Sequence, residues 1–146
     1  MQRTSGAYRC GFSLIELVLV MTLVGLVTAT VVHALALQLD RLAVRAAIAE
    51  AAGALGRARD EALARRAVVR VRIDTSQRTV TVRAADERIA YHALGHAHGV
   101  SLLTTRDSIA FDVRGLGYGA ANLTLIARRG RAADTLVVSR LGRVRY

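Results

Sequence analysis

The chain is notable first for what it lacks: none of its 146 residues is proline, lysine or tryptophan, and only one is cysteine. A lone cysteine, Cys10, excludes an internal disulfide framework and a four-cysteine zinc site. The absence of proline removes the strongest helix breaker from the whole chain. An apolar fraction of 53% is too high for a disordered chain, and the length suits one domain with one core.

One long apolar run accounts for much of this hydrophobicity. From Leu17 to Leu37 the only strongly polar residue is His33, which we expect at a membrane interface. These 21 residues are enough for a helix to cross a hydrocarbon core about 30 Å thick. The sequence therefore favours a single-pass membrane protein with a basic portion beyond the membrane.

The residues before this run leave two kinds of processing open. The first eleven carry Arg3 and Arg9 and no acid, as in the positive region of a targeting segment. In a secretory signal peptide, cleavage would follow the small residues that end at Ala36. A cut after Gly11 would instead expose the amine of Phe12. That amine would lie on the same helix face as the carboxylate of Glu16, four residues later, and could pair with it.

The segment from Gly11 to Leu17 (GFSLIEL) resembles the cleavage and methylation signature of type IV prepilins and type II secretion pseudopilins. The resemblance implies that prepilin peptidase cuts after Gly11 and that Phe12 becomes the N-methylated first residue. It implies that Glu16 pairs with the Phe12 amine of an adjacent subunit during assembly. The implied partners are other pilins or pseudopilins, contacted through the N-terminal helix, and the assembly platform of the inner membrane.

The orientation expected from the resemblance puts the leader in the cytoplasm and the C-terminal part in the periplasm, anchored in the inner membrane. The distribution of charge does not decide this, because Arg3 and Arg9 flank one end of the apolar run and Arg41 and Arg45 flank the other.

An apolar stripe predicts that the helix continues beyond the membrane to about Arg66. Its members are spaced alternately by four and three residues: Val44, Ile48, Ala51, Leu55, Ala58 and Ala62. Glu61 precedes Arg65 by four residues, the favourable order for a helical ion pair.

From residue 67 the period changes to two, which predicts antiparallel strands. We expect six, around residues 69–73, 80–82, 89–93, 109–113 and 123–125, with the last running from Leu136 towards Val144. The predicted fold class is α+β, with a long N-terminal helix packed on a C-terminal antiparallel sheet domain. The expected divisions are a leader (1–11), a transmembrane part (12–37), an amphipathic continuation (38–66) and a β domain (67–146).

Three short motifs beyond the apolar run resemble the H-type minor pseudopilins, the GspH/FimT family. They are RDEA beginning at Arg59, the pair Phe111 and Gly115, and a closing SRLGRVR beginning at Ser139. The secretion branch implies a minor pseudopilin of a periplasmic filament that helps export folded proteins. The pilus branch implies a minor type IV pilin, in some members with DNA capture. The soluble domain released by a signal peptidase is the third alternative.

Candidate DNA-binding residues gather near the C-terminus. The candidates are Arg128, Arg129, Arg131, Arg143 and Arg145. With Arg140 they face one acid, Asp134, in the last 19 residues, and such a patch can neutralise phosphates. The resemblance links the Gly-Arg-x-Arg ending to DNA. Against this reading, GC-rich coding explains an arginine-only, alanine-rich chain, and stacking aromatics are scarce nearby.

Enzymatic and metal-dependent functions find little support. His92, His96 and His98 lack cysteine or acidic co-ligands in the sequence, so we interpret them as part of a polar loop near a strand end. The glycines from Gly115 to Gly119 lack the spacing and following helix of a dinucleotide loop. We therefore predict a structural filament protein that is not an enzyme, with no cofactor and no metal.

Overall fold

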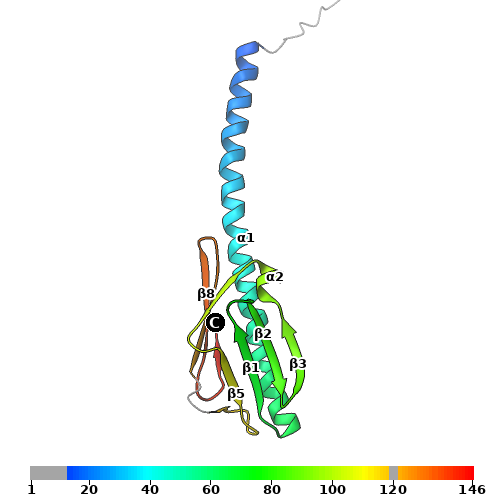
Figure 1. Cartoon of the computed structure of the whole chain (residues 1–146). Coiled ribbons are helices and arrows are strands. Elements are labelled where there is room, and N and C mark those ends of the chain that lie inside the picture. The colour runs from blue at the N-terminus through cyan, green and yellow to red at the C-terminus, as the bar shows by residue number, and fades with distance from the viewer. Residues whose placement is uncertain (1–12, 119–121) are drawn as a thin grey trace, which may run out of the picture. The chain divides into compact units, whose positions relative to one another are not determined.

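The computed structural model describes residues 13–118 and 122–146. In chain order the elements are α1 (Leu14–Arg65), β1 (Val69–Asp74), β2 (Thr79–Ala84), β3 (Glu87–His92), α2 (Leu94–His98), β4 (Ser101–Thr104), β5 (Ser108–Phe111), β6 (Gly117–Tyr118), β7 (Leu123–Arg129), β8 (Ala132–Val138) and β9 (Val144–Arg145). The chain divides into two units, one ending at Ala36 and one running from Leu37 to Tyr146 (Figure 1).

The first unit is the N-terminal part of α1. Ser13 caps the helix, since its hydroxyl oxygen accepts a hydrogen bond from the Glu16 backbone N–H at 3.2 Å. The most apolar stretch has a mean hydropathy of 2.4 and no buried residues, so the helix is long and apolar enough to cross a membrane. Its threonine hydroxyls (Thr22, Thr28 and Thr30) donate to backbone carbonyls one turn back. They therefore leave no unpaired donor towards lipid.

The second unit begins with the remainder of α1, whose predicted stripe is confirmed. All six stripe residues are buried, together with Ala47 and Ala54. The helix ends where Arg66 adopts a left-handed conformation with φ of 49°, and the Ala67 N–H donates to the Ala62 carbonyl in the manner of a Schellman cap. The predicted Glu61–Arg65 ion pair forms, at 2.6 Å.

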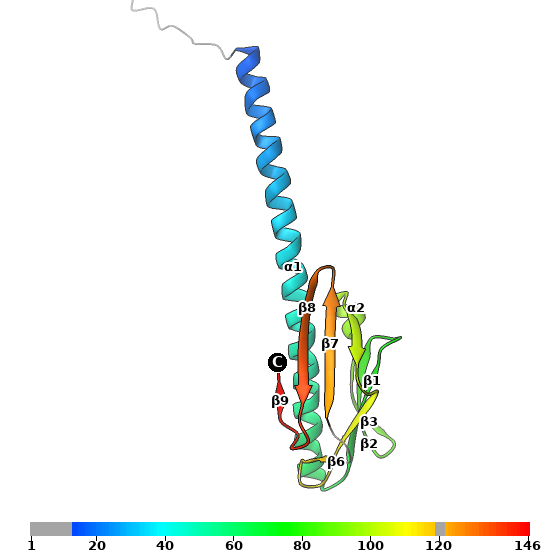
Figure 2. The same ribbon diagram turned by 90° about the vertical axis from the view of Figure 1, so that its left-hand side faces the viewer.

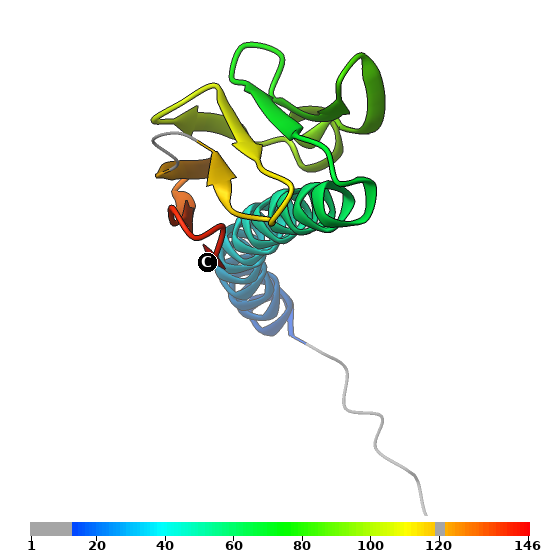
Figure 3. The ribbon, with the colours of Figure 1, turned by 90° about the horizontal axis from the view of Figure 1, so that it is seen from below.

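Two antiparallel sheets lie on one side of this part of α1 (Figure 3). One has the strand order β3-β2-β1-β5-β6 and the other β4-β7-β8-β9 (Figure 2). Strand β1 shows why the residues form a sheet: Val69, Val71 and Ile73 are buried, whereas Arg70 and Arg72 are exposed. The predicted α+β architecture, a long helix packed on antiparallel sheets, is confirmed.

The predicted strand pattern needs correction in several places. Strands β4 and β6 and the short helix α2 were missed, and the third strand ends at His92, before Ala93. The last predicted strand does not run through to Val144. It stops at Val138, where Ser139 and Arg143 are joined by backbone hydrogen bonding and Gly142 turns the chain with φ of 71° before β9 begins.

Candidate assembly and binding surfaces

The predicted processing residues Gly11 and Phe12 lie outside the described residues, which begin just after them. Glu16 is described, and it stands in the first turn of α1 as an exposed residue. Ser13 and Glu16 have the spacing of a capping box, and the serine half of it is formed. Within residues 13–118 and 122–146, the Glu16 carboxylate accepts no side-chain hydrogen bond and joins no ion pair.

The predicted C-terminal arginines do not form one patch. Arg129 is turned towards α1, where its Nε lies 2.9 Å from an Asp40 carboxylate oxygen, and its Nη1 donates to the His98 carbonyl at 2.8 Å. Arg128, which is exposed, pairs in register with Ser101 of β4. Arg131 stands in the turn between β7 and β8. The five candidates are thus distributed over separate surfaces.

Arg143 and Arg145 border a groove between α1 and the C-terminal segment, with a volume of about 620 Å³. Both side chains are exposed. The helix side of the groove has alanine and glycine residues together with Arg59 and Asp60. A methyl group added at Gly53 or Gly56 would meet nothing within 4 Å, so the groove is open over these two glycines.

The three short motifs, which begin at Arg59, Phe111 and Ser139, meet at one point in space. A Cβ on Gly142 would lie 2.9 Å from the Gly115 carbonyl oxygen and 3.2 Å from the ring of Phe111. A Cβ on Gly115 would lie 3.1 Å from Nε of Arg59. Both glycines have φ of 71°, which other residues rarely adopt. Gly142 of the Gly-Arg-x-Arg ending therefore has a structural explanation that does not involve DNA.

His92 and His98 bind one carboxylate, that of Glu50 on α1. His92 Nδ1 and His98 Nε2 each lie 2.7 Å from a different oxygen of Glu50. A carboxylate only accepts, so His92 Nδ1 donates to Glu50, and Arg57 Nη2 lies 3.3 Å from the other ring nitrogen, Nε2. Burial alone raises the pKa of Glu50, but the hydrogen bonds and charges of His98 and His92 outweigh it and hold the pKa below its ordinary value.

The expected polar loop is thus partly wrong, because His96 and His98 belong to α2 and His98 holds α1. The sequence offered no sign of Glu50 as their partner, since it lies more than 40 residues away. Among the described residues, no group of three histidine, cysteine or acidic side chains is arranged to hold a metal ion.

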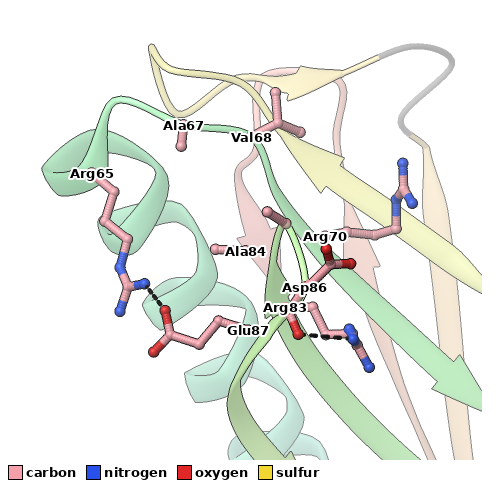
Figure 4. Close-up of a pocket in the computed structure, with 9 residues that line it drawn as sticks. Arg65, Ala67, Val68, Arg70, Arg83, Ala84, Asp86 and Glu87 are labelled. Atoms are coloured by element: carbon pink, nitrogen blue, oxygen red, sulfur yellow. Dashed lines mark hydrogen bonds and ion pairs between the residues drawn. The ribbon is translucent and has the colours of Figure 1, made fainter.

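A basic face on the β3-β2-β1-β5-β6 sheet was also missed. Arg70, Arg83 and Arg88 are exposed and lie side by side, because Arg70 pairs in register with Arg83, and Arg83 with Arg88. Arg70 and Arg83 line a pocket of about 710 Å³ at the end of α1, where Arg65 binds Glu87 (Figure 4). The alternation of valine and arginine in β1 is the signal that could have revealed this face.

A model of the family "Type II transport protein GspH" matches residues 47–142. The chain belongs to this family. The match covers most of the packed part of α1 and most of the β domain, including RDEA, Phe111, Gly115 and the closing motif as far as Gly142. A second model, the prokaryotic N-terminal methylation motif, matches residues 6–32. The predicted membership of the GspH-like pseudopilins is therefore confirmed.

Two solved structures share the fold of this GspH family member. Both are crystal structures of the type IV minor pilin FimU of Pseudomonas aeruginosa. The first is 17% identical with a TM-score of 0.62, and the match covers 73% of this chain and 89% of the FimU chain. The second is 15% identical with a TM-score of 0.58, and the match covers 69% of this chain and 90% of the FimU chain. No curated protein matches the chain.

Membership of the GspH family decides several coarser points. The family and its fold belong to structural pilins and pseudopilins, so the prediction that the chain is not an enzyme is confirmed. Pilin-like proteins assemble with other pilins. The methylation motif and the long apolar helix indicate a protein anchored in a membrane.

Proposed function

We propose that this protein is a minor pseudopilin of a type II secretion system, assembled from the inner membrane into a periplasmic filament that helps export folded proteins. One observation carries the proposal: a GspH domain and an N-terminal methylation motif occur together in one chain, at residues 47–142 and 6–32. The exposed apolar part of α1 supports anchoring before assembly.

The proposed maturation involves two groups at the start of α1. Prepilin peptidase cuts after Gly11, and the new amine of Phe12 is methylated. Glu16 stands near the membrane boundary without a partner among the described residues. A charged side chain costs about 2.5–3.5 kcal/mol at the bilayer centre and less at the boundary, so an unpaired carboxylate is unfavourable there. Pairing with the Phe12 amine of a neighbouring subunit offsets this cost, so assembly is favoured over the isolated subunit.

The proposed division of the chain follows from this maturation. Residues 1–11 form the leader and face the cytoplasm, residues 12–37 cross the inner membrane, and residues 38–146 lie in the periplasm. N-terminal mass spectrometry of the mature protein tests the division. N-methylated Phe12 is the expected first residue, whereas a chain beginning at Leu37 would show a secreted soluble domain instead.

Replacement of Glu16 by glutamine tests the assembly step. Glu16→Gln should leave cleavage and methylation intact but lower recovery in the sheared or cross-linked filament fraction at least tenfold, because the charge that pairs with the amine is gone. Glu61→Gln is the matched control, since it removes the same charge from the periplasmic part of α1. Equal recovery of both variants would contradict the proposed role of Glu16.

Deletion of the gene distinguishes secretion from piliation. Loss of folded exoproteins from the medium, with pili retained, is the result expected of a secretion pseudopilin. Loss of pili with normal secretion would place the protein with the pilus instead.

The second candidate function is DNA binding by a minor type IV pilin. Arg143 and Arg145 are exposed and share a groove with Arg59, which favours this candidate, whereas Arg129 is occupied by Asp40. The full chain in detergent would then bind duplex DNA with a steep salt dependence, and Arg143→Ala with Arg145→Ala would flatten the slope by about two charges. No binding at low salt would exclude it.

A further inference from the structure

Three arginines surround a small pocket near the start of the second unit. Arg41 and Arg45 of α1 and Arg131 of the β7–β8 turn line a space of about 330 Å³. The remaining lining residues are Val44, Ala132, Ala133 and Asp134. We call this space the arginine pocket.

The pocket exists because the β7–β8 turn is fastened to α1. Arg129, just before the turn, binds Asp40 with an Nε–Oδ1 distance of 2.9 Å. Gly130 lies so close to Asp40 that a Cβ there would overlap a carboxylate oxygen of Asp40, and its φ of 54° also favours glycine. These two contacts hold Arg131 beside Arg41 and Arg45, about ninety residues away in sequence. Figure 2 shows this turn beside α1.

The lining of the pocket carries an excess of positive charge, since its three arginines face one lining carboxylate, that of Asp134. Asp40 is already paired with Arg129. In residues 13–118 and 122–146, none of the three pocket arginines takes part in an ion pair. Three arginines around one space suit the charge of a phosphate group, which can accept paired N–H donors from a guanidinium.

The position of the pocket along α1 indicates where such a phosphate comes from. Arg41 and Arg45 follow Leu37 by four and eight residues, about 6 and 12 Å at 1.5 Å per residue. The polar headgroup layer of a bilayer occupies this distance beyond the hydrocarbon core. We propose that the arginine pocket binds the headgroup phosphate of an anionic phospholipid while the subunit is in the membrane. The proposal rests on the membrane anchoring proposed above, and it is independent of the secretion role.

The experiment uses the full chain in nanodiscs of phosphatidylcholine with phosphatidylglycerol as the anionic probe. Native mass spectrometry counts the phosphatidylglycerol retained per protein after release from the disc. The wild-type chain should retain it in preference to phosphatidylcholine. The triple variant Arg41→Gln, Arg45→Gln, Arg131→Gln should lose this preference at least tenfold, since one arginine near the surface contributes about fivefold.

A charge-matched triple variant provides the control. Arg70→Gln, Arg72→Gln, Arg83→Gln removes the same charge from the exposed face of the other sheet and should retain phosphatidylglycerol as the wild type does. The single variant Arg131→Gln, which leaves α1 intact, should lose about fivefold. If both triple variants lose phosphatidylglycerol equally, or if neither loses it, the proposed lipid site is wrong.

Two further arms separate the remaining explanations. If inorganic phosphate displaces the retained lipid at millimolar concentration, the pocket is a free-anion site, and the lipid proposal is wrong. Carbonate extraction of the membranes tests anchoring itself. If the chain resists extraction but retains no phosphatidylglycerol, the proposed lipid site is wrong and the membrane anchoring stands. If carbonate releases the chain, the proposed anchoring is wrong as well.

Discussion

The packing of the closing motif against Gly115 and Phe111 requires glycine at position 142. Gly142→Ala should lower the free energy of unfolding by about 2 kcal/mol or more, because alanine is strained at φ of 71° and its Cβ would press on the Gly115 carbonyl at 2.9 Å. Thermal unfolding of the full chain in detergent, followed by circular dichroism at the β-sheet signal, measures the loss.

Gly53→Ala is the contrasting control for that substitution. A Cβ at this position meets nothing within 4 Å, and alanine is favoured over glycine in a helix by about 1 kcal/mol. The variant should therefore be as stable as the wild type or more stable. Similar destabilisation by both substitutions would show that Gly142 has no special conformational role.

Glu50 should make the β domain sensitive to acid. The pKa of its carboxyl in the folded chain lies below the ordinary value of 4.5, so its contribution to stability is complete above that value and is lost as the pH falls through the folded-state pKa. Glu50→Gln should lower stability at neutral pH and flatten its decline below about pH 4.5. Urea unfolding at a series of pH values measures this. An unchanged acid limb would mean that the contacts with His92 and His98 do not stabilise the ionised carboxylate.

At the scale of elements, the Arg129–Asp40 ion pair should hold the turn of the β7–β8 hairpin against α1. Arg129→Ala removes the contacts with Asp40 and the His98 carbonyl, so amide hydrogen exchange in the turn should accelerate. Global stability should fall by less than about 1 kcal/mol, because the pair is partly exposed. Arg128→Ala, on the neighbouring exposed residue, should leave exchange unchanged. Equal protection in both variants would contradict the attachment.

The same elements show how far the sequence alone could lead. Alternation in β1 and the four-three spacing in α1 reveal local periodicity, so both were predicted from their own residues. Strand β4 was missed because Leu102 and Leu103 are adjacent apolar residues, one buried and the other 48% exposed. The short α2 has no side-chain cap to mark its start.

The candidate site was predictable in the same uneven way. The motif around Glu16 is contiguous, so its residues could be found by reading along the chain. The arginine pocket and the Glu50 contacts join residues that are 42 to about 90 positions apart, and no periodicity encodes such pairings. Likewise, the C-terminal arginines are close in sequence, but Arg129 is turned towards Asp40 whereas Arg128 is exposed.

At the scale of the whole molecule, the two units should separate cleanly into an anchor and a folding unit. Among the described residues, the buried core begins at Val44. The large apolar side chains from Leu14 to Leu35 are each more than 40% exposed. A fragment beginning at Gln38 should therefore be soluble without detergent and unfold cooperatively, with a melting temperature within a few degrees of that of the full chain, because it retains the complete core. The full chain should need detergent, since its exposed apolar surface has no partner in water. Circular dichroism melts and sedimentation of both forms test this. A fragment that melts without cooperativity would show that the first unit contributes to folding as well as to anchoring.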